Sequence, residues 1–283
     1  MSEDRPPKER DRTDSDNPGA QEDSAEKGRS HDLGEMGLFE HLEELRSRLL
    51  RCIAAAFIGM LACYAFSERL FDWLMLPLYE ALPDKGSMIY TAPHEAFFIY
   101  IKTAFVAGIF LTSPYIFHQF WLFVKPGLYP HERKYIVPIS FCSALLFVGG
   151  AVFGYTVIFP YAYKFFMGFT DLFISPMITM KEGFSFAVRL LIAFGVVFEL
   201  PLVILFLSGL GVVNAPMLRK KRKYMLLIFF MLAAFLTPPD LITQTLMAGP
   251  LILLYEVSIL IAMIFGRKPK KKDSGELAAE GKE

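Results

Sequence analysis

Cysteine and histidine, two common ligands of metals, are scarce in this chain. Its 283 residues include three cysteines and five histidines, and neither type recurs at the spacing of a metal site. The sequence also lacks the phosphate-binding motif GxxxxGK[ST], the zinc motif HExxH and the nucleophile motif GxSxG. Cys52, Cys63 and Cys142 all fall in apolar stretches, as small buried hydrophobic residues do. We therefore expect no enzyme activity, no metal and no cofactor.

Charged residues are also few, and hydrophobic residues take their place. Charged residues make up 20% of the chain and hydrophobic residues 54%, including 28 phenylalanines. Because about 20 apolar residues span a bilayer, six apolar segments predict transmembrane helices at residues 49–66, 96–117, 135–159, 190–210, 225–236 and 245–265. The predicted fold class is an all-α integral membrane protein with six transmembrane helices, the last two of them short. The fifth is only about 18 Å long, which leaves a packed hairpin and a locally thinned bilayer both open.

The two ends of the chain differ from this apolar middle. Residues 1–35 are rich in charge, serine, proline and glycine, and they lack the apolar stretch of a secretory signal peptide. Residues 267–283 have a similar composition. Such segments bury too little surface to offset their chain entropy. We therefore expect two disordered arms around one membrane domain at residues 36–266.

Lysine and arginine are distributed unequally between the two sides of this predicted domain. One side carries sixteen, including the runs RKKRK at residues 219–223 and KPKKK at residues 268–272. The other side carries only six, which are Arg69, Lys85, Lys102, Lys164, Lys181 and Arg189. Because positively charged loops stay in the cytoplasm, both termini are predicted to be cytoplasmic.

The loop between the first two predicted spans, residues 67–95, is not a plain linker. Its apolar stretch is too short to cross a bilayer and contains Pro77 and Pro83, and proline breaks helices. The loop therefore predicts short interfacial helices that cap the outer face.

A glutamate interrupts the fourth apolar segment, LLIAFGVVFELPLVILFLSGL. Glu199 lies near its centre, where an ionised side chain costs about 2.5–3.5 kcal/mol. Pro201 lacks an N–H and displaces the carbonyl of Val197, so it predicts a kink beside the carboxylate. A structural hydrogen bond to a neighbouring helix and a position in a functional cavity are both open, and intramembrane ionisable residues favour the cavity.

Further polar residues lie near the ends of the predicted spans. Asp240 and Gln244 predict a polar patch between the fifth and sixth spans. Glu44 and Arg48 are four residues apart, so a surface ion pair worth about 0.2–0.5 kcal/mol is one interpretation of Glu44. Glu132 falls in the first turn of the third span, where the helix dipole stabilises an anion. At Glu44 and Glu132 these structural roles compete with a functional one.

Five motifs occur in order along the chain: HLEELRSRL, FVKPGLYPHERK, AFGVVFELP, LRKKRKY and LTPPDLITQ. Together with six predicted spans and cytoplasmic termini, they resemble the TatC family, the receptor core of the twin-arginine protein translocase. The resemblance covers residues 36–266. It implies a cupped helix bundle in the bacterial inner membrane. It also implies that the protein binds the twin-arginine signal peptides of folded proteins and mediates their export.

The resemblance also implies partners and site residues. It assigns the recognition of the two signal-peptide arginines to Glu44 and Glu132, with Arg46 and Phe123 beside them. This is chemically reasonable, because the planar guanidinium pairs with carboxylates better than an ammonium does. The implied partners are the single-span TatA and TatB proteins and further copies of this chain, with the proton-motive force as energy source.

The same resemblance places Glu199 in the concave face, where the apolar part of the peptide inserts, and Pro77 in the outer cap. Lys134 departs from the family pattern, in which a second arginine often follows Arg133, and an ammonium lacks the bidentate fork of a guanidinium. The alternative function is a secondary transporter of a small solute, which would also use a kinked helix and a midplane carboxylate. That alternative predicts paired broken helices, and we find no such pair in the sequence.

Overall fold

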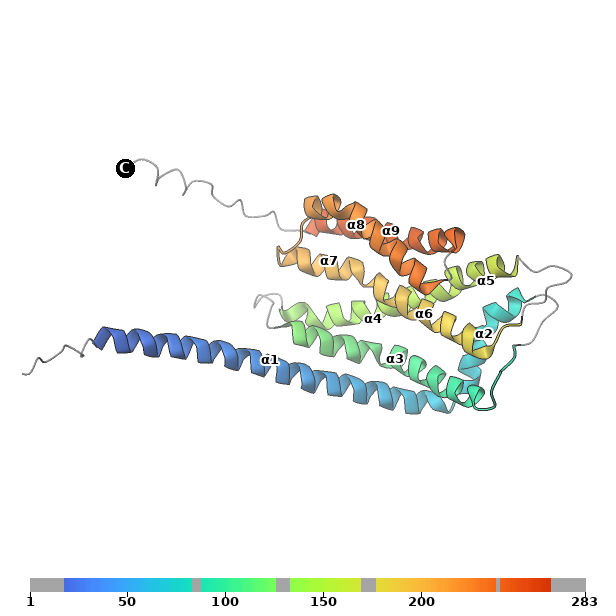
Figure 1. The fold of residues 1–283 in the computed structure, drawn as a ribbon, viewed down its shortest axis with the longest axis horizontal. Coiled ribbons are helices and arrows are strands. Elements are labelled where there is room, and N and C mark those ends of the chain that lie inside the picture. The colour runs from blue at the N-terminus through green and yellow to red at the C-terminus, as the bar shows by residue number, and fades with distance from the viewer. Residues whose placement is uncertain (1–17, 83–87, 126–132, 169–176, 238–239, 266–283) are drawn as a thin grey trace, which may run out of the picture. The chain divides into compact units, whose positions relative to one another are not determined.

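The computed structural model describes residues 18–82, 88–125, 133–168, 177–237 and 240–265. These residues form helices and one isolated β-bridge, between Ile89 and Thr179. The helices are α1 (Pro18–Tyr64), α2 (Ser67–Ala81), α3 (Glu95–Val124), α4 (Ile136–Phe153), α5 (Phe159–Met167), α6 (Met180–Phe198), α7 (Leu200–Gly209), α8 (Ala215–Leu236) and α9 (Leu241–Phe265) (Figure 1). A π-helical segment, Gly154–Ile158, joins α4 to α5.

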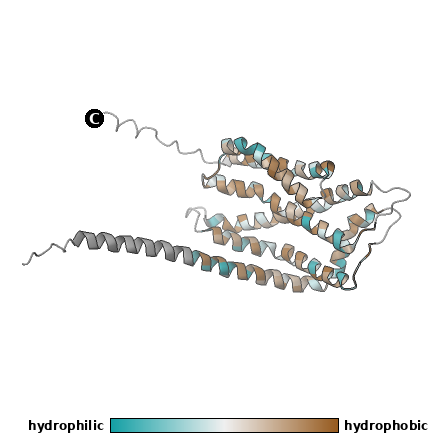
Figure 2. Cartoon of the chain, in the orientation of Figure 1, coloured by the Kyte–Doolittle hydropathy of each residue, from teal (hydrophilic) through white to brown (hydrophobic). Residues whose placement is uncertain are grey.

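The predicted all-α membrane fold is confirmed. Five helical segments are long and apolar enough to cross a membrane: Glu40–Tyr64, Glu95–Val124, Ile136–Met167, Met180–Gly209 and Leu241–Ile264. Figure 2 shows hydrophobic residues along the length of the helices within residues 50–283. Many of these hydrophobic side chains are exposed. The predicted fifth span is the apolar part of α8, which begins with a run of basic residues. The count of six crossings stays a prediction.

Residues 1–49 and residues 50–283 form two compact units. Helix α1 extends back to Pro18, into the segment that we expect to be a disordered arm. Residues 1–17 and the predicted tail at 267–283 lie outside the described residues. The proposed domain boundaries at residues 35 and 267 stay predictions.

Within residues 50–283 the helices pack side by side as a bundle (Figure 1). Helix α4 packs against α3 and α6, while α8 and α9 pair with each other and α9 packs on α7. Glycines allow two close approaches between helices, one of α3 to α1 and one of α4 to α6. A Cβ at Gly108 would lie 2.4 Å from the backbone nitrogen of Met60, and a Cβ at Gly150 would lie 2.5 Å from the carbonyl oxygen of Phe194. Contacts of small residues with backbone are a common way for transmembrane helices to associate.

The expectation that Pro77 breaks the outer loop into shorter helices is wrong. Helix α2 runs from Ser67 to Ala81 straight through Pro77. Pro77 has no N–H to donate to the carbonyl of Trp73, four residues earlier. The hydroxyl of Tyr155 donates to that carbonyl instead, at 2.5 Å, and its ring stacks on the Trp73 indole at 4.6 Å. A tertiary contact therefore satisfies the oxygen that the proline frees. Pro83 lies outside the described residues.

The Glu95 carboxylate also stabilises the start of α6 by hydrogen bonding. Glu95 is 8% exposed, and its Oε2 accepts hydrogen bonds from the N–H (2.9 Å) and the hydroxyl (3.2 Å) of Thr91. Its Oε1 accepts from the N–H of Lys181 at 3.0 Å, in the first turn of α6. Glu95 thus joins the segment before α3 to α6, beside the Ile89–Thr179 bridge.

We expect Tyr155→Phe to destabilise the protein by about 0.5–1.5 kcal/mol, because the Trp73 carbonyl, which has no N–H partner at Pro77, loses its part-buried hydrogen bond to the Tyr155 hydroxyl. The measurement is thermal unfolding of the purified protein in detergent. Tyr161→Phe is the matched control, since Tyr161 is 59% exposed on α5. Equal midpoints for the wild type and Tyr155→Phe would show that the hydroxyl does not hold α2 in place.

Candidate functional site

Glu199 lies at a break between two helices inside the bundle. Helix α6 ends at Phe198 and α7 begins at Leu200, so the predicted interruption next to Pro201 is present. The Glu199 N–H donates to the Val196 carbonyl at 3.1 Å, a tighter pattern than that of an α-helix. Glu199 is therefore a polar residue at a helix break within the 30-residue apolar segment Met180–Gly209.

The Glu199 side chain is part of a hydrogen-bonded network that spans three helices. The residue is 9% exposed, and its carboxylate hydrogen-bonds to Ser143 on α4. The Ser143 hydroxyl accepts from the indole Nε1 of Trp121 on α3, at 2.8 Å. Among the described residues, the Glu199 Oε1 has no hydrogen-bond partner. We call Trp121, Ser143 and Glu199 the Glu199 network.

The Glu199 network combines features of both open interpretations. The bond to Ser143 is the hydrogen bond to a neighbouring helix that the structural interpretation predicts. The unpartnered Oε1 is what a functional site would offer, because a buried polar atom without a partner costs free energy. The carboxylate therefore retains one acceptor for a ligand, a partner helix or a proton.

Further polar side chains lie on α3 and α4 near this network. His118 Nδ1 lies 3.4 Å from the Ser140 hydroxyl, which donates to the Ile136 carbonyl at 2.6 Å. His118 and Trp121 are three residues apart, as are Ser140 and Ser143, so each pair shares one helix face. Our sequence reasoning missed both serines. The signal for them was their spacing within the apolar stretch VPISFCSALLF.

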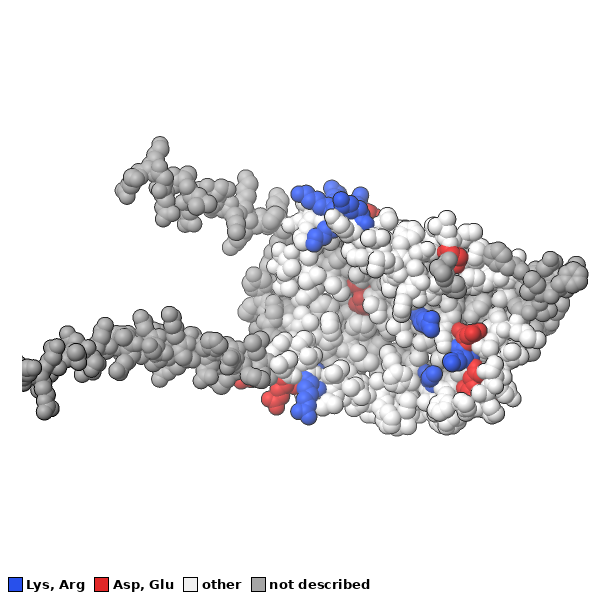
Figure 3. Space-filling view, viewed as in Figure 1, with Lys and Arg blue, Asp and Glu red and all other residues white. Residues whose placement is uncertain are grey.

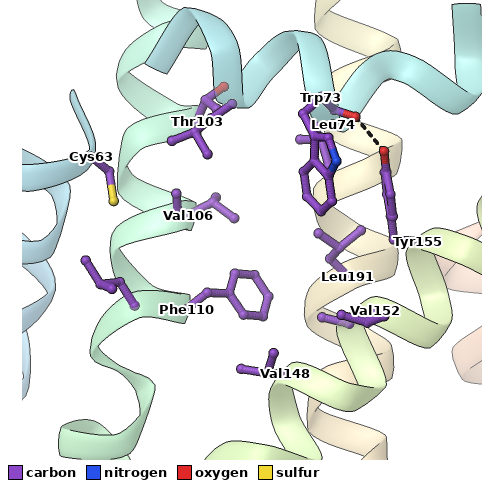
Figure 4. A pocket seen from close by; sticks show the side chains of 14 residues that line it. Cys63, Trp73, Leu74, Thr103, Val106, Phe110, Val148, Val152, Tyr155 and Leu191 are labelled. Atoms are coloured by element: carbon purple, nitrogen blue, oxygen red, sulfur yellow. Dashed lines mark hydrogen bonds between the residues drawn. The ribbon is translucent and has the colours of Figure 1, made fainter. Parts of the chain in front are cut away.

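An apolar pocket of about 390 Å³ lies among α2, α3, α4, α6 and the end of α1 (Figure 4). Val106 and Phe110 of α3 face Val148 and Val152 of α4 across it, and the Trp73–Tyr155 stack lies at one end. The Thr103 hydroxyl donates to the backbone carbonyl four residues earlier, at 2.8 Å, so it offers little polarity. The pocket can therefore accept an apolar chain but not a charged one.

In the unit formed by residues 1–49, the Glu44 carboxylate forms an ion pair with the Arg48 guanidinium. Its Oε1 accepts from Arg48 Nε at 2.9 Å and from Arg48 Nη2 at 2.5 Å, so the ion pair that the spacing predicts is present. Its Oε2 lies 3.9 Å from His41 Nδ1. Arg46 is exposed on the same helix. The position of Glu44 thus suits a guanidinium ligand.

The other predicted residues of the arginine site are described only in part. Glu132 lies outside the described residues. Phe123 is half-buried in the last turn of α3, and the Lys134 ammonium lies 5.1 Å from the centre of the Tyr135 ring. A joint site of Glu44 and Glu132 stays a prediction.

The polar residues of α8 and α9 join these two helices. The Asp240 carboxylate accepts from the N–H of Thr243 at 2.7 Å and from its hydroxyl, which caps the start of α9. The Gln244 amide donates to the carbonyl of Phe230 on α8, at 2.8 Å. The predicted patch therefore consists of a helix cap and an interhelical bond.

Glu256 lies within the apolar length of α9 and is paired there. Its carboxylate accepts a hydrogen bond from the Arg222 guanidinium of α8. Both side chains are about half exposed, and the pair crosses between the two helices. This carboxylate thus has a structural partner, in contrast to the Oε1 of Glu199.

Apolar helices that can cross a bilayer, with a carboxylate buried at a helix break, define a multi-pass helical membrane protein with a polar site inside its bundle. The family model "Sec-independent protein translocase protein (TatC)" matches residues 40–250, and the chain belongs to the TatC family. The resemblance of its sequence motifs is thereby confirmed.

Individual relatives agree with this assignment. The Sec-independent protein translocase protein TatC of Desulforapulum autotrophicum is 48% identical over 237 residues, which cover 84% of this chain and 87% of that protein. The protein of the same name from Magnetococcus marinus is 46% identical over 243 residues, which cover 86% of this chain and 88% of that protein. A crystal structure of the twin-arginine translocase receptor TatC matches with a TM-score of 0.71 at 40% identity. That match covers 78% of this chain and 97% of the crystallised one.

Proposed function

We propose that this protein is the receptor subunit of a twin-arginine translocase. It binds the twin-arginine signal peptides of folded proteins and mediates their export, without a catalytic step of its own. The observation that carries the proposal is the match to a crystallised twin-arginine translocase receptor over 97% of that chain. A secondary transporter of a small solute is disfavoured by membership in the TatC family.

The proposal places the protein in the bacterial inner membrane with both termini in the cytoplasm. Support comes from the basic start of α8, which Figure 3 displays as a group of lysine and arginine side chains. Loops rich in these residues are retained on the cytoplasmic side. The proposed membrane domain is residues 36–266.

In the proposed recognition step, Glu44 and Glu132 bind the two adjacent arginines, with Arg46 and Phe123 at the edge of the site. The support is chemical, because Glu44 already accepts two N–H groups from Arg48. An incoming guanidinium would replace a contact of the same kind, so the exchange costs little. A twin-lysine sequence would lose the fork geometry.

The apolar segment that follows the arginines in the signal peptide would occupy the apolar pocket beside α3 and α4. Glu199 and Pro201 would then form a polar site within the bundle, at the place where the peptide and partner helices meet. The oxygen of Glu199 that lacks a partner supports this role.

Single-span TatA and TatB proteins and further copies of this chain are the proposed partners, and the proton-motive force is the proposed energy source. The polar patch of Asp240 and Gln244 is the proposed contact for a partner helix. Pro77 contributes to the proposed outer cap because it has no N–H for the Trp73 carbonyl, which accepts a hydrogen bond from the Tyr155 hydroxyl instead.

Photocrosslinking tests this proposal. A photoreactive residue at Val106 or Val148, which line the apolar pocket, should form adducts with a twin-arginine signal peptide. The same photoreactive residue at Leu260, which is 53% exposed on α9, is the matched control and should form few adducts. A twin-lysine peptide should reduce the adducts at all positions. Equal adducts at the pocket and at Leu260 would contradict the proposed binding mode.

A further inference from the structure

A second cavity, of about 460 Å³, lies where the start of α6 meets the end of α8. We call it the α6–α8 cavity. Lys181, Ser185 and Arg189 line it and are spaced four residues apart, so they share one face of α6. Phe235 and Leu236 of α8 form an apolar part of its wall. Figure 3 shows lysine and arginine side chains together with carboxylates over this part of α6.

The two cations of the cavity have no charged partner in the part of the chain that the structure describes. Neither the Lys181 ammonium nor the Arg189 guanidinium forms an ion pair with a described carboxylate. Glu95, close to Lys181, uses both of its oxygens for Thr91 and the Lys181 backbone N–H. Because an unpaired cation within a membrane span is costly, an arginine there indicates a ligand.

The depth of these residues matches the headgroup layer of a bilayer. The segment Met180–Gly209 has 30 residues and is about 45 Å long, whereas the hydrocarbon core is about 30 Å thick. Roughly 7 Å at each end therefore extends beyond the core, which puts Lys181 among the headgroups. Arg189 starts about 12 Å further along the helix. Helical side chains tilt towards the N-terminus, so its guanidinium can reach back to the phosphate level.

The charge of the cavity fits a phosphodiester. Glu182 also lines the cavity, so two cations and one carboxylate leave one net positive charge. A phospholipid phosphodiester carries one negative charge and accepts hydrogen bonds from a guanidinium, an ammonium and a hydroxyl such as that of Ser185. The apolar wall of Phe235 and Leu236 can contact the acyl chains beneath the phosphate.

We propose that the α6–α8 cavity binds the headgroup phosphate of an anionic phospholipid in the leaflet at the start of α6. Lys181 and Arg189 are the two cationic contacts. This site is separate from the Glu199 network and from the apolar pocket, and it does not depend on signal-peptide recognition.

Native mass spectrometry of the full-length protein in detergent tests the proposal. The protein is titrated with phosphatidylglycerol and with phosphatidylcholine of identical acyl chains. We expect the first phosphatidylglycerol to bind at least about tenfold more tightly than phosphatidylcholine, since charge-assisted hydrogen bonds are strong. Arg189→Gln and Lys181→Gln should each remove most of this preference and leave phosphatidylcholine binding unchanged.

Arg69→Gln is the matched control, because Arg69 is an exposed arginine on α2 that does not line the cavity. It should retain the full preference. The thermal unfolding midpoint of each variant reports whether it is folded, and Lys181→Gln changes only an exposed side chain in the first turn of α6. Equal affinities of the wild type for the two lipids, or an unchanged preference in both cavity variants, would overturn the proposal. Displacement of phosphatidylglycerol by equimolar inorganic phosphate would overturn the assignment to a lipid.

Discussion

Replacing Glu44 or Glu132 with alanine is expected to abolish the export of twin-arginine proteins while the variant still accumulates in the membrane. Each carboxylate would supply charge-assisted hydrogen bonds worth about 1.5–3 kcal/mol to a guanidinium. Losing either one should weaken signal-peptide binding at least about tenfold. The measurement is export of a twin-arginine reporter in cells whose only TatC is the variant, with the membrane level of the protein determined in parallel.

Glu43→Ala is the matched control for this prediction, because Glu43 is an exposed carboxylate next to Glu44 on the same helix. It should export normally. A purely structural role predicts a different result for Glu44→Ala. Loss of the partly buried Glu44–Arg48 pair within one helix would cost about 0.2–0.5 kcal/mol and leave export near normal. Normal export by Glu44→Ala and Glu132→Ala would therefore contradict the arginine site.

Glu199→Gln is expected to reduce export strongly while the protein stays folded. The amide keeps the shape of the side chain and can still bond to Ser143, but it can neither gain nor lose a proton and has one acceptor oxygen instead of two. Because the unpartnered oxygen of Glu199 is proposed to serve a partner helix or a proton, its replacement should reduce transport and leave stability nearly unchanged. Export of the reporter and thermal unfolding in detergent measure the two effects separately.

Glu256→Gln is the matched control for Glu199→Gln. Glu256 is also a carboxylate within an apolar helix, but it is paired with Arg222. Its substitution should lower stability slightly, by about 0.2–1 kcal/mol, and leave export near normal. Equal export by the two variants would mean that Glu199 has no special role.

Local chemistry explains which features of the fold could be predicted from the sequence. The break at Glu199 depends on Pro201, which removes a hydrogen bond within its own helix. The Glu44–Arg48 pair likewise depends only on a spacing of four residues. Pro77 failed as a predictor because its effect is compensated by Tyr155, which is 78 residues away in the chain and close only in the folded structure.

The candidate site was predicted less completely for the same reason. Glu199 was identified because a carboxylate stands out in an apolar segment. Ser143 and Trp121 were not, since a serine or a tryptophan in a membrane helix has many ordinary roles and only packing brings these two to Glu199. The apolar pocket was also missed, because its valines and phenylalanine have the same composition as the lipid-facing surface.

The affinity of a twin-arginine signal peptide for the purified full-length protein tests the central claim most directly. The comparison is a peptide identical except that both arginines are lysines. Since the lysine ammonium keeps the charge but loses the planar fork, a receptor for the arginine pair should bind the twin-lysine peptide at least about tenfold more weakly. Equal affinity for the two peptides would contradict the assignment of this protein as a twin-arginine receptor.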